Sequence, residues 1–132
     1  MKTLCVLLIA FFCAANAMYS YTPEWQQCRI NGFKLTDVTL DQPPVAGEDS
    51  TFHFCGYGSD FLHIDFQFVH ATSGTFIDET LETSGCAEYM QSACLKVSLR
   101  IPEGVPQTLE VQFDIKDNYY GVLASVNVAL TF

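Results

Sequence analysis

A regular alternation of apolar and polar residues between Cys94 and Lys116 constrains the fold of this chain more than any other feature. Every second residue is apolar from Leu95 to Ile101 and again from Leu109 to Ile115, and the residues between them are polar or charged. A period of two predicts two consecutive half-buried strands of an antiparallel sheet, apolar on one face and charged on the other. The stretch 102–106 between them carries two prolines and a glycine, which fits a connection at a sheet edge.

The same period recurs along the rest of the chain. Further strands are predicted over Phe33–Leu40, Ser50–Gly56, Phe61–His70 and Val122–Phe132, with a short additional strand over Thr75–Thr83. Met18–Gln27 is expected to be an extended lead-in and Ser84–Ala93 a loop, and no helical period of any length is present. Short strands separated by turn residues predict an all-β fold, an immunoglobulin-like β-sandwich of two antiparallel sheets.

The N-terminal segment has the pattern of a secretory signal peptide. Lys2 provides the positive charge, Leu4–Ala14 is apolar, and Ala15-Asn16-Ala17 is a small-x-small cleavage site. We therefore expect residues 1–17 to be removed and residues 18–132 to form one domain of 115 residues. No later apolar run is long enough to cross a bilayer as a helix.

Four cysteines, Cys28, Cys55, Cys86 and Cys94, remain after the predicted cleavage. An even number in a small secreted chain predicts two disulfides, and four cysteines allow three pairings. We favour Cys86–Cys94, which closes a short local loop, and this choice leaves Cys28–Cys55.

The charge balance of the chain excludes one class of partner. Removal of the signal peptide takes one lysine with it and leaves five basic against fifteen acidic side chains, a formal charge of −10. Nucleic acid is not an expected partner, because affinity for it comes from neutralising phosphates. Constitutive docking on anionic membranes is disfavoured for the same reason. The acidity indicates either simple solubility or a compartment of low pH, where some carboxylates protonate.

Motifs for catalysis, metals and cofactors are missing from the sequence. It contains no G-x-S-x-G, no phosphate-binding loop and no dinucleotide fingerprint. Asp78, Glu79 and Glu82 could in principle perform acid–base chemistry, but acids clustered on a polar segment are typical of a solvated face. The histidines are scattered, and no C-x-x-C pair accompanies them. We expect no enzyme activity, no metal and no cofactor.

Large apolar residues accumulate on the predicted inward faces of the strands. Six of these positions are phenylalanines: Phe52, Phe54, Phe66, Phe68, Phe113 and Phe132. The ordinary interpretation is a filled sandwich core about 10 Å thick. The alternative is an apolar space between the sheets that accepts a lipid tail, and periodicity does not distinguish the two.

Several motifs in order resemble the ML (MD-2-related lipid-recognition) family. They are the cysteine soon after the signal peptide, the segment Pro43–Gly47, the Cys86…Cys94 spacing, the Val105-Pro106 turn and the final strand ending at Phe132. The chain is most similar to the NPC2-like members and to the phosphatidylglycerol/phosphatidylinositol transfer proteins. The cysteine that most members carry in the last strand is absent here, so that Cys28 is left to pair with Cys55.

The resemblance implies a sandwich with a lipid between its sheets. By position, the residues implied to line the cavity or its rim are Phe54, Phe66, Phe68, Val97, Leu99, Val105, Pro106, Val111 and Phe113. Val105 and Pro106 match a tyrosine-proline pair at the pocket rim of the sterol-transfer member.

The leading hypothesis is therefore a lipid-binding or lipid-transfer protein that is secreted or resides in the endolysosomal lumen. It would take a sterol, a phospholipid acyl chain or a fatty acid between its sheets, as a monomer, with transient contact to a membrane or a membrane protein. The alternative is a secreted β-sandwich recognition module that binds a protein partner and carries no lipid.

Overall fold

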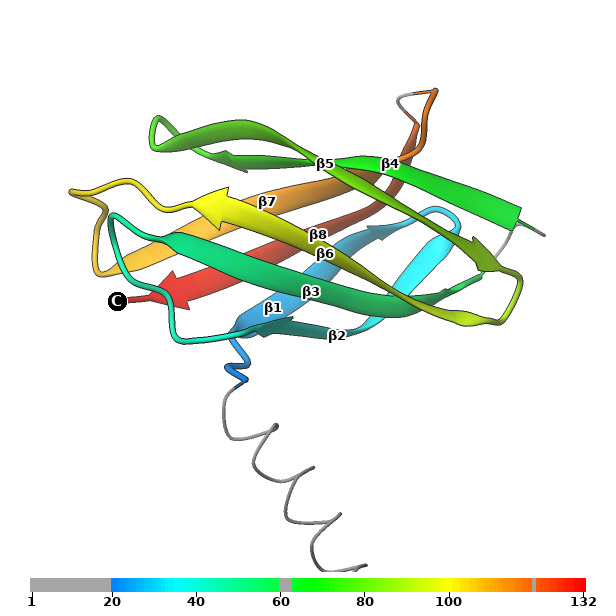
Figure 1. Ribbon diagram of the computed structural model, residues 1–132, viewed down its shortest axis with the longest axis horizontal. Coiled ribbons are helices and arrows are strands. Elements are labelled where there is room, and N and C mark those ends of the chain that lie inside the picture. Colours follow the sequence, from blue (N-terminus) through cyan, green and yellow to red (C-terminus); the bar gives the residue numbers. More distant parts are fainter. Residues whose placement is uncertain (1–19, 60–62, 120) are drawn as a thin grey trace, which may run out of the picture.

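The computed structural model describes residues 20–59, 63–119 and 121–132, so the predicted signal peptide lies outside the described residues. Strands and turns make up these ranges (Figure 1). The strands are β1 (Glu24–Ile30), β2 (Phe33–Leu40), β3 (Asp49–Gly58), β4 (His63–Ser73), β5 (Ile77–Glu88), β6 (Ser92–Arg100), β7 (Thr108–Lys116) and β8 (Val122–Thr131). Nothing within the described ranges forms a helix that could cross a membrane.

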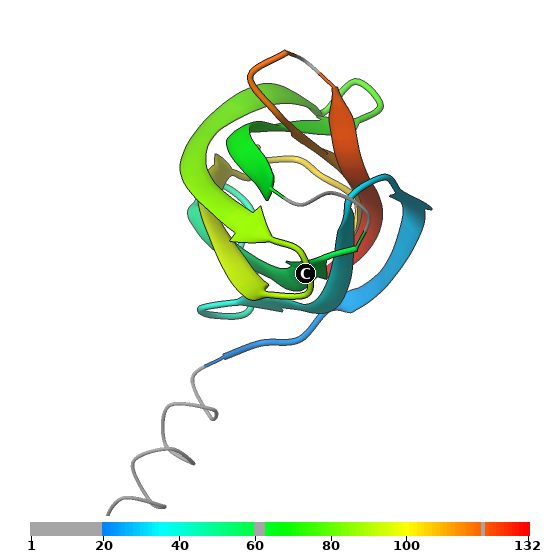
Figure 2. The ribbon, with the colours of Figure 1, turned by 90° about the vertical axis from the view of Figure 1, so that its right-hand side faces the viewer.

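The strands form two antiparallel sheets that face each other. A five-stranded sheet has the order β1-β8-β7-β4-β5, and a three-stranded sheet has the order β2-β3-β6. Both sheets curve strongly, so that the end-on view in Figure 2 shows an almost closed ring of strands. The predicted all-β sandwich is confirmed.

Alternation places the apolar residues between the sheets. In β6, Leu95, Val97 and Leu99 are buried while the residues between them are exposed. β7 repeats the pattern, but it belongs to the other sheet. The loop 102–106 does begin at a sheet edge, since β6 is the last strand of its sheet, but the prediction that it joins two strands of one antiparallel sheet is wrong, because it crosses from one sheet to the other. The two alternating segments present their apolar faces to each other across the core.

Two predicted irregular segments are strands in the structure. β1 begins at Glu24, within the expected lead-in, and pairs with β8. β5 begins at Ile77, which confirms the short strand predicted over Thr75–Thr83, but it extends to Glu88, through the first half of the predicted loop, and pairs with β4. Both are edge strands with mostly exposed side chains, so the sequence lacks the apolar alternation that identifies half-buried strands.

The predicted disulfides are wrong in both pairings. Cys55 of β3 and Cys94 of β6 stand directly opposite each other in the three-stranded sheet, with Cα atoms 4.1 Å apart, and they form a disulfide. Cys28 and Cys86 are exposed free thiols. Their positions on β1 and β5, at opposite edges of the five-stranded sheet, explain why they do not pair with each other.

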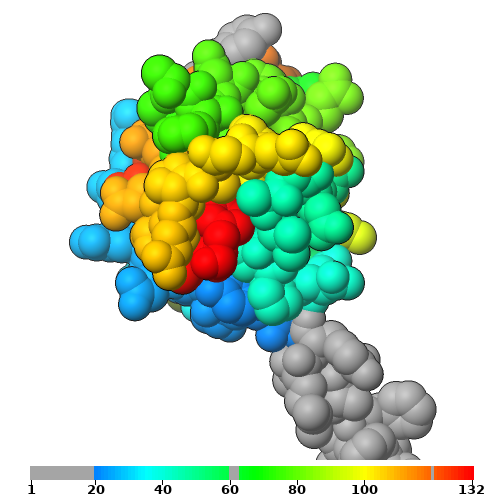
Figure 3. Space-filling view, turned by 90° about the vertical axis from the view of Figure 1, so that its left-hand side faces the viewer, coloured from blue at the N-terminus to red at the C-terminus, as the bar shows by residue number. Residues whose placement is uncertain are grey.

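The two ends of the sandwich differ in how the sheets are connected. At one end, here called the crossover end, the chain passes between sheets from β1 to β2, from β3 to β4 and from β5 to β6. At the opposite end, called the hairpin end, β2–β3 and β4–β5 connect strands within one sheet, and only β6–β7 crosses between sheets. Figure 3 views the hairpin end, where the C-terminal residues lie between these connections.

Candidate functional site

The space between the sheets is the first candidate site, because it is continuous and almost wholly apolar. Twenty-five buried hydrophobic residues from both sheets form one cluster, and among the described residues the buried polar side chains are Ser50, Ser73 and Ser125. An interior of this kind is chemically suited to a hydrocarbon and offers no buried charge to a polar ligand.

Phenylalanine rings make the contact between the two sheets. Phe52 and Phe54 of β3 lie with their ring centroids 4.9 Å and 5.0 Å from the ring of Phe113 on β7. Phe33 of β2 and Phe66 of β4 form a second edge-on pair across the sheets at 4.9 Å. These separations are those of favourable aromatic pairs, so the rings pack against one another in this structure.

The structure places most of the predicted lining residues in this interior. Those with fully or almost fully buried side chains are Phe54, Phe66, Val97, Leu99, Val111 and Phe113. Val105 packs partly against the core from the β6–β7 connection, and Pro106 beside it is exposed. Whether they contact a lipid stays a prediction.

Phe68 is the exception, and its assignment to the interior is wrong. The register between β4 and β5 shifts between Phe66 and Phe68, and from there on the buried residues of β4 are Val69 and Ala71. Phe68 is consequently on the outer face, where the ammonium group of Lys116 lies 5.7 Å from the centre of its ring. An irregularity of this kind moves the following side chains to the opposite face of the strand, and the alternation of apolar residues before it does not predict where this happens.

A hollow of about 540 Å³ lies around this outward phenylalanine. Its lining residues come from three neighbouring strands and the turn after β7: Gln67, Phe68, His70, Thr80, Glu82, Lys116 and Asn118. His70 is fixed there by contacts of Nδ1 to Thr80 Oγ1 (3.1 Å) and of Nε2 to Asp78 Oδ1 (2.9 Å). Phe68 is the one hydrophobic residue among the described residues that line it, so this hollow suits a lipid tail less well than the interior does.

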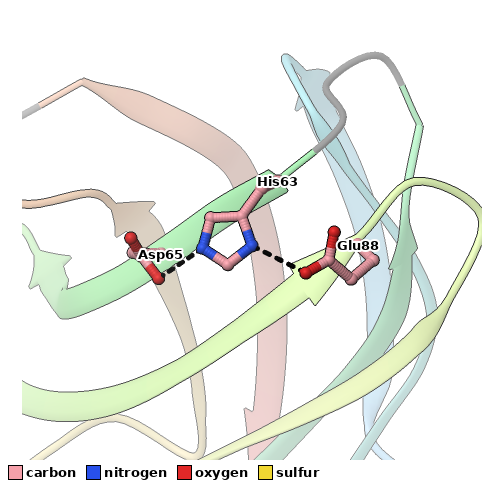
Figure 4. A network of polar contacts seen from close by, with 3 residues as sticks. All are labelled: His63, Asp65 and Glu88. Atoms are coloured by element: carbon pink, nitrogen blue, oxygen red, sulfur yellow. Dashed lines mark hydrogen bonds and ion pairs between the residues drawn. The ribbon is translucent and has the colours of Figure 1, made fainter.

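A polar cluster lies at the crossover end, where β4 begins and β5 ends (Figure 4). The ring of His63 contacts Asp65 Oδ1 through Nε2 and Glu88 Oε1 through Nδ1, both at 2.9 Å. Hydrogen bonds from the ring to Glu88 and then to Asp65, together with the charges of both carboxylates, raise the pKa of His63. The cluster therefore favours a doubly protonated imidazolium that links β4 to β5.

Metal binding finds no support in these contacts. His53 contacts Asp41 Oδ1 at 2.6 Å, so each histidine of the chain has a carboxylate neighbour. Within the described residues, however, no three histidine, cysteine or acidic side chains are grouped so that they could hold a metal ion.

Comparison with known proteins adds one finding about the fold. No family model matches the sequence, and no curated protein matches it. The crystal structure of a Niemann-Pick type C2 protein from the Japanese carpenter ant does match, with a TM-score of 0.55 over 82% of this chain and 98% of that chain, at 10% sequence identity. This chain shares the fold of that protein. The fold that the resemblance implies is thereby confirmed, and at this identity the likeness is one of fold alone.

Two contributions to the candidate site do not follow from the sequence pattern. Phe33 is the first residue of β2, and the alternation of apolar residues does not predict that its ring contacts the ring of Phe66 on the other sheet. Because β6 and β7 belong to different sheets, Val97 and Leu99 of β6 face the five-stranded sheet. Which sheet a strand joins depends on its pairing partners, and the alternation of apolar residues does not reveal it.

Proposed function

We propose that this protein binds a lipid by taking its hydrocarbon tail between the two sheets, and that it carries or presents the lipid rather than transforming it. The observation that supports the proposal best is the combination of a continuous apolar interior with the fold shared with a Niemann-Pick type C2 protein. Nothing in the sequence pattern or in the polar clusters favours a catalytic role.

The way in which the sheets touch makes uptake physically reasonable. The contacts between them are made by flat rings such as Phe52, Phe54 and Phe113, which can turn about two side-chain torsions each. A tail that inserts between the rings has to part them, and its own contacts with the rings offset part of the packing energy that is lost. Desolvation of the tail supplies roughly 25 cal/mol for each Å² of apolar surface removed from water, before ordering costs.

The compartment is part of the same proposal. The Cys55–Cys94 disulfide is compatible with an oxidising environment. We infer that the protein acts as a secreted or endolysosomal monomer that meets membranes or membrane proteins transiently.

The test is a tryptophan placed in the interior and a matched one placed outside. Val111 is fully buried on β7, whereas its neighbour Gln112 is exposed on the opposite face of the same strand. Val111→Trp should abolish uptake of a fluorescent fatty acid or sterol, and Gln112→Trp should leave it unchanged, with circular dichroism showing that both proteins are folded. Equal uptake by wild type and a folded Val111→Trp protein would show that the interior is not the binding site.

One observation favours the alternative of a recognition module without cargo. The rings of Phe52, Phe54 and Phe113 already fill the centre of the sandwich, as expected for an ordinary core. A protein of this kind would take up none of the probes, and the exposed faces would then be the sites of interaction.

A further inference from the structure

The hairpin end is the place where the two sheets can part most easily. Only the β6–β7 connection joins them there, against three connections at the crossover end. On one side the hairpin end is also held by the segment before β1, since Tyr21 and Leu40 exchange backbone hydrogen bonds of 2.8 Å and 2.7 Å. Any opening should therefore lie on the other side, towards β5 and β6.

Apolar side chains surround this end of the molecule. Each of its three connections presents one: Val45 between β2 and β3, Phe76 between β4 and β5, and Val105 between β6 and β7. Val45 is 50% exposed and Phe76 is 43% exposed, and Val105 reaches the core. A hydrocarbon tail that enters at this end could contact these side chains on its way from solvent to the interior.

Carboxylates surround the same apolar side chains. The acidic residues of the three connections and of the adjoining strand ends are all exposed: Asp41, Glu48, Asp49, Asp78, Glu79, Glu103 and Glu110. Two of them contact a histidine, Asp41 with His53 and Asp78 with His70, and among the described residues the others have no histidine contact. Arg100 is at this end too, with Nη1 3.9 Å from Asp49 Oδ1, so its charge is largely offset. The side chain of Glu103 lies directly over Gly47, where a Cβ would be 2.9 Å from its Cγ, and this brings the carboxylates of the β2–β3 and β6–β7 connections together.

The remaining basic residues lie elsewhere. Arg29, Lys34 and Lys116 belong to strand ends at the crossover end, and Lys96 is in the middle of β6. The end at which the sheets can part is therefore the strongly acidic one.

Glu79 differs from the other acidic residues of this end because it lies on the inner face of its strand. It stands opposite the buried Ala71 of β4, and it alternates in phase with Ile77 and Leu81, which face the interior. Its side chain is therefore on the inner face of β5, yet it is exposed, because this edge of the five-stranded sheet has no further strand beside it. A carboxylate on the inner face at the rim lies where the head group of an inserted lipid would emerge.

We propose that the hairpin end is the mouth of the lipid site, and that its ring of carboxylates with Glu79 at the inner edge selects amphiphiles with cationic or uncharged head groups over anionic ones. This inference rests on the proposed function and specifies its ligand class. At roughly 7 Å in a largely aqueous setting, one carboxylate changes the affinity for a unit charge by a factor of about three to ten. Several carboxylates together should make amphiphiles with cationic head groups bind most tightly, those with uncharged head groups less tightly, and those with anionic head groups most weakly.

The experiment compares probes that share one tail and differ only in head group: trimethylammonium, hydroxyl and sulfonate, all kept below their critical micelle concentrations. Binding to the mature protein is measured by calorimetry at about 0.02 M and about 0.5 M NaCl, because salt screens charges that are exposed at a rim. The trimethylammonium probe should bind at least tenfold more tightly than the sulfonate at low salt, and the difference should shrink at high salt.

Two carboxylates on β5 provide a matched pair of variants. Glu79→Gln removes the charge from the inner face, and Glu82→Gln removes one from the outer face of the same strand, where Glu82 lines the outer hollow. Glu79→Gln should lower the affinity for the trimethylammonium probe about three- to tenfold and raise the affinity for the sulfonate by a similar factor, and Glu82→Gln should change both much less. Glu79→Lys should reverse the effect of the wild-type side chain and favour the sulfonate.

The possible outcomes separate the two proposals. Equal affinities for the three probes, or equal effects of Glu79→Gln and Glu82→Gln, would overturn the charge selection while leaving lipid binding intact. Failure of every probe to bind would overturn both. If Glu79 only protects an exposed sheet edge, Glu79→Gln will increase self-association and leave the order of the probes unchanged, which also counts against the proposal.

Discussion

Phe52 of β3 and Phe113 of β7 lie with ring centroids 4.9 Å apart, across the space between the two sheets. Both rings are fully buried, and Phe54 contacts Phe113 from the same side at 5.0 Å. Through these rings the three-stranded sheet rests on the five-stranded one. The rings that hold the two sheets together are therefore the ones that a tail between the sheets would have to displace.

The outward position of Phe68 can be tested against its neighbour two residues earlier. Phe66 is buried between the sheets, so Phe66→Ala should lower the free energy of unfolding by about 3–5 kcal/mol. Phe68 packs on the outer face under Lys116, so Phe68→Ala should cost only about 1–2 kcal/mol. Urea denaturation of both variants measures the difference, and similar losses would contradict the register shift in β4.

The His63 cluster should make stability depend on pH in a defined direction. Because the pKa of His63 is raised above 6.5, its pairing with Glu88 and Asp65 stabilises the fold fully below that value. The contribution is lost as the pH rises through the higher pKa of the folded state.

The measurement for this cluster is the melting temperature of wild type and His63→Gln across the pH range. The wild type should melt above the variant at about pH 5.5, and the two should converge above about pH 8. A difference that grows with rising pH, or one that is constant, would contradict the assignment of a charged His63 in the folded protein.

The cysteine arrangement gives a chemical prediction. In the mature chain, alkylation without reduction should label Cys28 and Cys86, and proteolytic mapping should recover a peptide that joins Cys55 to Cys94. The bridge spans 39 residues of sequence, so replacing both of its cysteines with alanine should cost about 3–4 kcal/mol. Recovery of a Cys86–Cys94 or Cys28–Cys55 peptide would contradict the pairing of β3 with β6.

Much of this fold is visible in the sequence, because half-buried strands must alternate. The alternation identifies β2, β3, β4, β6, β7 and β8 to within a few residues. It fails for β1 and identifies only the first part of β5, because their edge positions leave both faces largely exposed and require no apolar period there.

Features that depend on pairing partners could not be predicted. Which cysteines meet is decided by the register of β3 on β6, which sets Cys55 opposite Cys94. The side to which Phe68 points is decided by a shift in the β4–β5 ladder, and the crossing from β6 to β7 is decided by sheet order. These are relations between segments distant in sequence, and the period of any single segment contains no information about them.

The candidate site likewise has one part that the sequence predicts and one part that it does not. The apolar interior follows from alternation, because Val97, Leu99, Val111 and Phe113 are in phase with their strands. The acidic hairpin end does not, since its carboxylates come from three connections that only the topology brings together.

The central claim is that the space between the sheets holds a lipid, and mass spectrometry of an organic extract tests it most directly. The protein is purified in its native state from its own source or a secreting host, and the folded Val111→Trp variant is prepared in the same way. The extract of the wild type should contain a hydrocarbon-tailed molecule with a cationic or neutral head in near-stoichiometric amount, and the extract of the variant should lack it. A wild-type extract with no more lipid than that of the variant would contradict the account.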